Sequence, residues 1–137
     1  MKPVVLDCSV TIAWCFQDET STFTDRVLEY VRKHTALVPP LWLSEVTNVL
    51  LSACKRERID PEGSLLFLET VSRLPIRIAS LSSKEYFSEI YKVALDLALT
   101  SYDATYLYLA LREDCPLATL DDKLKSASRK MRLPKFG

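Results

Sequence analysis

Four acidic residues, spread over most of the chain, each stand where an apolar run meets an expected helix. They are Asp7, Glu45, Asp103 and Asp121. In an α/β protein such junctions gather at one edge of the sheet, where open α/β sheets bind their ligands. Carboxylates brought together repel one another unless a cation offsets their charge. If these four converge, we expect a divalent metal ion between them and a metal-dependent enzyme.

Each acid also has a purely structural explanation. Asp7 and Asp121 could cap the helices that follow them. Asp103 could close a capping box with Thr100, or simply favour the positive end of its helix. Glu45 could belong to a solvated stripe on its helix. Taken singly, each acid is compatible with such a role, and the surrounding residues must decide.

Three polar residues stand at spacings that direct them toward the acids. Thr119 precedes Asp121 by two residues, so strand alternation puts both side chains on one side. Asn48 follows Glu45 by three residues and shares its helix face. With Ser9, these groups could orient water and carboxylates from behind the ligands. Hard oxygen ligands suit Mg²⁺ or Mn²⁺, which activate water and polarise phosphoryl groups.

Short apolar strands alternate with helical patterns along the chain. We expect strands at 3–6, 36–38, 76–79 and 117–120, with a weaker one at 132–133. Helices are expected at 9–16, 21–33, 41–58, 61–74, 103–112 and 122–130, and after a capping box at 82–85. The alternation predicts an α/β fold with a parallel sheet, right-handed crossovers and helices on both faces. We expect residues 1–137 to form one domain.

Composition narrows the class of protein further. The chain has 137 residues, of which 48% are hydrophobic, enough to bury a core. No apolar run approaches the roughly 20 residues of a membrane helix, so no membrane association is expected. The four cysteines make no C-x-x-C pair and there is a single histidine, which excludes a Cys/His zinc site. We expect free thiols and a cytoplasmic protein.

Basic residues cluster in two places, although the formal net charge is zero. One group comprises Lys55, Arg56 and Arg58. The other contains no acid and comprises Lys123, Lys125, Arg129, Lys130, Arg132 and Lys135. Such groups are commonly solvated helix ends. Beside an acidic metal site they could instead steer a phosphate backbone.

The segments around the acids resemble those of the PIN-domain family, and more narrowly the VapC-type toxins of prokaryotic toxin–antitoxin pairs. The matching segments are Val-Val-Leu-Asp7-Cys8-Ser9-Val, Ser-Glu45-Val-Thr-Asn48, Ser-Tyr-Asp103-Ala-Thr-Tyr and Leu-Ala-Thr119-Leu-Asp121. Their order and spacing agree with the family over nearly the whole chain. The resemblance implies a three-layer α/β/α sandwich with a five-stranded parallel sheet in the order 3-2-1-4-5.

The resemblance also implies an Mg²⁺- or Mn²⁺-dependent endoribonuclease that cleaves single-stranded RNA. In that enzyme the four acids are the catalytic residues, and Asp7 and Asp103 are the metal ligands. Ser9, Asn48 and Thr119 match accessory polar positions. Homodimerisation and silencing by a cognate antitoxin protein are implied in the same way.

Three other functions compete with a toxin ribonuclease. A housekeeping RNA-processing nuclease would share the same four acids. A PIN fold retained as a binding module would have no activity of its own. A phospho-receiver domain is disfavoured, because it needs a second acid beside the first strand and a phosphoacceptor aspartate after the third. Here Asp7 is followed by Cys8, and the strand at 76–79 by Ser80.

Overall fold

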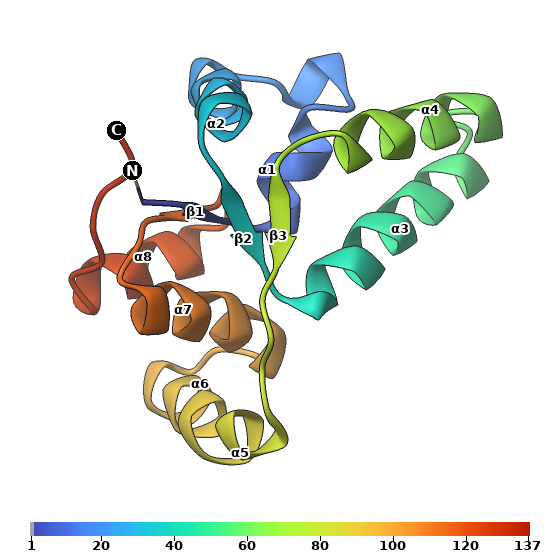
Figure 1. Ribbon diagram of the computed structural model, residues 1–137. Coiled ribbons are helices and arrows are strands. Elements are labelled where there is room, and N and C mark those ends of the chain that lie inside the picture. Colours follow the sequence, from blue (N-terminus) through green and yellow to red (C-terminus); the bar gives the residue numbers. More distant parts are fainter. Residues whose placement is uncertain (1) are drawn as a thin grey trace.

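A computed structural model describes residues 2–137 and contains a parallel sheet of four short strands (Figure 1). The strands are β1 (Val4–Leu6), β2 (Ala36–Val38), β3 (Ile76–Ile78) and β4 (Leu117–Ala118). Their order is β3-β2-β1-β4, and each neighbouring pair is parallel. Helices occupy every crossover, as parallel connections require. The predicted α/β class and parallel sheet are confirmed.

The predicted fifth strand is wrong, so the strand order is 3-2-1-4 rather than 3-2-1-4-5. Arg132, where that strand was expected, adopts a left-handed conformation with φ of 55°. The N–H of Leu133 donates to the carbonyl of Ser128 at 3.1 Å. Pro134 has no N–H to donate. Residues 131–137 therefore pass the edge of the sheet without forming a ladder.

Helices cover both faces of the sheet (Figure 1). In that view α1 to α4 lie above and to the right of the strands, and α5 to α8 lie below and to the left. A 3-10 turn precedes α2, and a π-helical turn joins α5 to α6. The elements are α1 (Cys8–Ala13), η1 (Gln17–Glu19), α2 (Thr22–Lys33), α3 (Pro40–Lys55), α4 (Pro61–Ser72), α5 (Ser83–Glu85), η2 (Tyr86–Ile90), α6 (Tyr91–Leu97), α7 (Ser101–Glu113) and α8 (Asp122–Lys130).

Local capping sets where several helices begin. The predicted box at Ser82 and Glu85 is present, with each side chain accepting the other residue's backbone N–H. Asp60 accepts the N–H of Gly63 at 2.7 Å, which starts α4. Thr100 accepts the N–H of Asp103 at 3.1 Å, so α7 begins two residues earlier than expected. Such caps satisfy N–H groups that have no partner within the helix.

The core lies where the two central strands meet α1, α3 and α7. Both strands are apolar and buried along their whole length, because both of their faces are covered. Trp42 is 4% exposed and donates its indole N–H to Thr11 at 3.0 Å, which joins α3 to α1. Within residues 2–137, none of the helices has the length and apolar character needed to cross a membrane.

Candidate active site

Two adjacent strands and two helices supply the four predicted acids. Asp7 follows β1, and Asp121 lies just beyond β4, its parallel neighbour, so both acids emerge at the same edge of the sheet. Asp103 lies in the first turn of α7, which packs against β1 and β4. Glu45 lies in the second turn of α3. The topology thus brings residues from four distant segments toward the carboxyl ends of the strands.

Asp7 is buried and held by two hydroxyl groups. It is 7% exposed, and its Oδ2 accepts hydrogen bonds from Ser9 and Thr119, each at 2.7 Å. Ser9 Oγ in turn accepts the N–H of Leu120, and Thr119 Oγ1 accepts that of Asp121, both at 3.0 Å. The side chain of Asp7 makes no cap to α1. Asp7 thus occupies the predicted N-cap position of α1, but its carboxylate is used elsewhere.

Asp121 and Asp103 both lie at helix N-termini but are used differently. Asp121 Oδ2 accepts the N–H of Leu124 at 3.0 Å and caps α8, so its structural explanation is confirmed. At α7 the cap comes from Thr100, whose hydroxyl accepts the N–H of Asp103. The carboxylate of Asp103 makes no hydrogen bond with any other group in residues 2–137. Its oxygens are available to a ligand.

Glu45 is held by a residue that the sequence did not single out. Tyr106 is 1% exposed, and its hydroxyl donates to Glu45 Oε1. Burial and this hydrogen bond raise the pKa of Tyr106 well above its ordinary value, so the hydroxyl keeps its proton. Tyr106 follows Asp103 by three residues, and that spacing places both on one side of α7. The spacing is the signal by which Tyr106 could have been found.

The acids are near enough to influence one another's ionisation. Burial raises the pKa of Glu45; the Tyr106 hydrogen bond opposes this, and Asp7 and Asp103 add to it. Burial likewise raises the pKa of Asp103, with further increases from Asp121 and Asp7 and an opposing effect from Lys123. Like charges at short range destabilise the ionised forms. The four carboxylates therefore form one electrostatic cluster with little cationic compensation.

Two further residues near these acids, Asn48 and Cys8, have no evident part in the site. Asn48 is exposed and lines a separate hollow beside Phe16 and Arg56. Within residues 2–137 it forms no side-chain hydrogen bond with any of the four acids. Cys8 is buried beside Asp7, and burial, then Glu45 and Asp7, raise the pKa of its thiol to about 12. A thiol that keeps its proton is a poor nucleophile. All four cysteines are free, as expected.

The donor chemistry suits a hard divalent cation. Asp7 Oδ2 is engaged by two hydroxyls, while its Oδ1 and the Asp103 carboxylate have no hydrogen-bond partner within residues 2–137. Over those same residues, no three His, Cys, Asp or Glu side chains are grouped closely enough to hold a metal ion as they stand. Because Mg²⁺ keeps several waters and uses only one or two carboxylates, a dedicated protein cage is not required.

The fold is that of an α/β protein with acidic residues at the carboxyl ends of its strands, and comparisons with known proteins give its family. The chain belongs to the PIN-domain family, whose model ("PIN domain") matches residues 4–130. The structure is similar to the crystal structure of PAE2754 from Pyrobaculum aerophilum, with a TM-score of 0.71 and 22% sequence identity over 92% of this chain and 86% of that chain. At this identity the likeness supports the fold alone. No curated protein matches the chain in sequence.

Family membership confirms the PIN resemblance predicted from the four sequence segments. PIN domains are generally nucleases, so membership indicates a hydrolase. Members of the family act on RNA and usually use divalent metals. The narrower assignment to VapC-type toxins stays a prediction.

Proposed function

We propose that this protein is a divalent-metal-dependent endoribonuclease with Asp7, Glu45, Asp103 and Asp121 as its catalytic residues. One observation carries the proposal. A buried aspartate, fixed by two hydroxyls at the end of β1, shares its surroundings with carboxylates from α3, α7 and the β4–α8 junction. Holding carboxylates together without cations costs free energy, and a metal-binding function accounts for that cost.

In this proposal Asp7 and Asp103 would hold Mg²⁺ or Mn²⁺, because Asp7 Oδ1 and the Asp103 carboxylate accept no hydrogen bond within residues 2–137 and are free to bind a cation. The ion, when bound, would polarise the scissile phosphoryl group and lower the pKa of a water nucleophile. Ser9 and Thr119 orient Asp7, and Tyr106 orients Glu45. Glu45 and Asp121 complete the negative surface that attracts the ion. Asn48, being exposed on the same helix as Glu45, lies where it could meet the RNA strand.

The test compares three proteins in Mg²⁺ or Mn²⁺ with a labelled single-stranded RNA. Asp7→Asn preserves size and hydrogen-bond acceptance but removes the charge, and we expect cleavage to fall by roughly 100-fold or more, as several kcal/mol of transition-state stabilisation are lost. Asp114→Asn is the control, since Asp114 is exposed and pairs with Lys2 on the surface. Equal cleavage by the wild type and Asp7→Asn would contradict the proposal.

We further propose that the nuclease is the cytoplasmic toxin of a toxin–antitoxin pair; the alternative is a housekeeping RNA-processing nuclease. Support comes from the resemblance of the four sequence segments to VapC-type toxins. Induced expression should arrest growth with the wild type but not with Asp7→Asn, and co-expression of an adjacent small reading frame should relieve the arrest. Normal growth during expression of the active enzyme would favour the housekeeping role.

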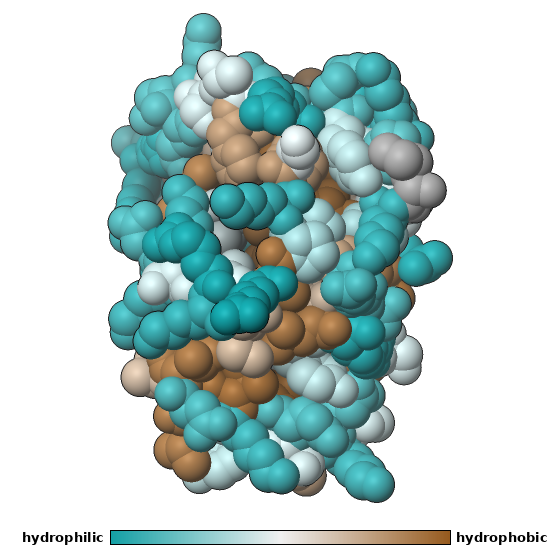
Figure 2. All heavy atoms as spheres, turned by 90° about the vertical axis from the view of Figure 1, so that its left-hand side faces the viewer, coloured by the Kyte–Doolittle hydropathy of each residue, from teal (hydrophilic) through white to brown (hydrophobic). Residues whose placement is uncertain are grey.

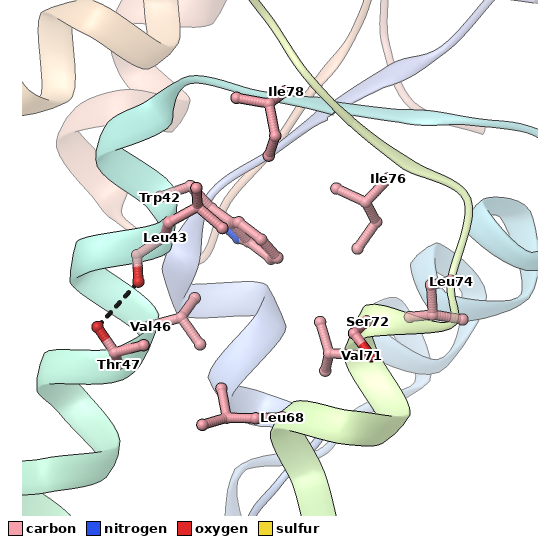
Figure 3. A pocket seen from close by; sticks show the side chains of 10 residues that line it. All are labelled: Trp42, Leu43, Val46, Thr47, Leu68, Val71, Ser72, Leu74, Ile76 and Ile78. Carbon is pink, nitrogen blue, oxygen red and sulfur yellow. Dashed lines mark hydrogen bonds between the residues drawn. The ribbon is translucent and has the colours of Figure 1, made fainter. Parts of the chain in front are cut away.

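A homodimer is proposed as the working form. An apolar cavity of about 230 Å³ lies between α3, α4 and the edge strand β3, with Trp42, Val46 and Ile76 pointing into it (Figure 3). Leu43 and Ile78 beside it are 47% and 42% exposed. Exposed apolar surface of this kind is typical of a protein interface. Sedimentation velocity should give a dimer for the wild type and a monomer for Leu43→Lys.

A further inference from the structure

A second cavity, of about 780 Å³, lies at the opposite edge of the sheet, beside β4. It is an open hollow lined by residues of α2 and α8, by Leu117 and Thr119 at β4, and by residues 132–136, where the predicted fifth strand is missing. Thr119 forms part of its wall, and the same residue holds Asp7 through its hydroxyl. The cavity therefore adjoins the candidate active site. Figure 2 shows the side of the molecule that carries α8 and both termini, where hydrophilic side chains surround hydrophobic ones.

The lining of this cavity combines two kinds of surface. One part is apolar and includes Phe23, Leu133 and Phe136. Phe136 packs edge-on against Phe23, with ring centroids 6.0 Å apart, and this contact holds residues 132–136 over α2. The other part is cationic and contains Lys125, Arg129, Arg132 and Lys135. No acidic residue lines the cavity.

These four cations differ from Arg58 of the other basic group. Arg58 is neutralised by Asp18 and Glu19 at 2.9 and 2.8 Å. None of the four cavity cations forms a salt bridge with an acid in residues 2–137. Uncompensated cations in a partly enclosed space create a strongly positive local potential. The cavity thus favours an anion.

Ser128 provides an independent sign of a ligand. Ser128 is one of the residues that line the cavity, and its Oγ is buried and has no hydrogen-bond partner within residues 2–137. Buried hydroxyls are rarely left unpaired, because the loss of water is then uncompensated. A change of the Ser128 rotamer toward the cavity would let a ligand with hydrogen-bonding groups pair with this hydroxyl.

We propose that this cavity binds one nucleotide of the RNA strand, next to the scissile phosphate. The inference rests on the proposed ribonuclease function. A nucleotide unit carries an apolar base face for the aromatic wall and a phosphate for the lysines and arginines. The base must leave its stack to enter, which a single strand allows and a duplex opposes. The cavity would therefore contribute to selection of single-stranded RNA.

The first test measures RNA binding by fluorescence anisotropy in a metal chelator, so that no cleavage occurs. Lys125→Gln/Arg129→Gln should weaken binding of a labelled single strand by roughly tenfold and lower the salt slope of log K by about 1.4, from two lost phosphate contacts. Lys84→Gln/Lys92→Gln, on exposed positions of α5 and α6, is the matched control for net charge. Equal weakening in both pairs overturns the proposal.

The second test identifies the ligand by amide NMR shifts in the wild type. Uridine monophosphate should shift Ser128, Leu133 and Lys135, whereas inorganic phosphate should give only part of that response. Identical responses to the two probes would reduce the cavity to a phosphate site and overturn the nucleotide assignment. No response to either probe would do the same.

Cleavage assays on the same variants separate this inference from the proposed function. If the wild type cleaves RNA and Lys125→Gln/Arg129→Gln binds it normally, the cavity proposal fails alone. If the wild type does not cleave RNA, but its binding still depends on Lys125 and Arg129, the nuclease proposal fails and the cavity stands. Arg129→Lys, which keeps the charge, should retain most of the affinity, which separates the loss of charge from the loss of the arginine itself.

Discussion

Two glutamates accept hydrogen bonds from tyrosines two residues apart on α7, yet their pKa values move in opposite directions. Glu45 is bonded by Tyr106, and its pKa is raised by burial and by the carboxylates around it. Glu85 is bonded by Tyr108 at 2.6 Å, and its pKa is lowered to about 2. The lowering comes first from Tyr108, then from the N–H of Ser82 and from Arg112.

The difference between the two sites lies in their remaining partners. Arg112 donates to Glu85 at 2.9 Å and also to the carbonyl of Ser80, so the chain itself supplies the balancing cation. Around Glu45 the nearby charged groups are Asp7 and Asp103. A carboxylate satisfied by its own chain stabilises the fold. A carboxylate surrounded by other carboxylates can instead bind an external cation. The presence or absence of a cationic partner within the chain thus distinguishes a structural acid from a functional one.

The largest expected effect is a difference in the rate of RNA cleavage between substitutions of the two glutamates. Glu45→Gln should lower the rate of RNA cleavage by roughly 10- to 100-fold, the usual cost of removing a group that supports a metal site. Glu85→Gln should leave the rate unchanged, because its partners lie within the α5–α7 region. Both are measured by cleavage of labelled RNA in Mn²⁺. A similar loss in both variants would remove the functional distinction.

Metal binding should involve the acids around Glu45 and not the surroundings of Glu85. A 100-fold excess of Mn²⁺ over its dissociation constant should stabilise the wild type by about 2.7 kcal/mol, seen as a rise in Tm. Asp103→Asn should lose this rise, because a proposed ligand is gone. Glu85→Gln should keep it. A metal-dependent rise retained in Asp103→Asn would place the ion elsewhere.

The two tyrosines should also separate in their effects. Tyr106→Phe leaves a half-buried carboxylate without its donor, and we expect a loss of roughly 1 kcal/mol in the free energy of unfolding, limited by solvent access to Glu45, together with slower cleavage. Tyr108→Phe should cost less, since Ser82 and Arg112 still bond Glu85. Urea denaturation and cleavage assays measure both. Unchanged cleavage in Tyr106→Phe would show that Glu45 needs no such orientation.

The smallest expected effect is on the pH dependence of stability, to which Glu85 and Glu45 should contribute with opposite signs. The folded-state pKa of Glu85 is depressed to about 2 from 4.5, so its stabilisation is complete above pH 4.5 and is lost as the pH falls toward 2. For Glu45 the folded-state pKa is raised, so its ionisation costs stability as the pH rises through 4.5. In metal-free urea titrations, the wild type should have a higher free energy of unfolding than Glu85→Gln, and this difference should shrink as the pH is lowered. The free energy of unfolding of Glu45→Gln should increase relative to that of the wild type as the pH rises. If both variants changed in the same direction with pH, the contrast between the two glutamates would be refuted.

Features that depend on neighbours along the chain could be predicted from the sequence. The buried strands, the capping box at Ser82 and the cap at Asp60 are examples, because each involves residues at most four positions apart. The junctions that carry the four acids were visible for the same reason. The expected fifth strand is absent because α8 ends in a left-handed turn at Arg132, whereas the short apolar pattern at 132–133 alone is equally compatible with a strand.

The sequence by itself determined which residues could do chemistry and roughly where each stands on its element. Only the tertiary structure decided how each acid is used. Asp7 is directed to Ser9 and Thr119 rather than to its own helix, whereas Asp121 does cap the helix that follows it. Tyr106 reaches Glu45 across 61 positions of sequence. Local patterns constrain the backbone within a few residues, but hydrogen bonds and charge interactions depend on distance in space, which the packing of the whole sheet and its helices sets.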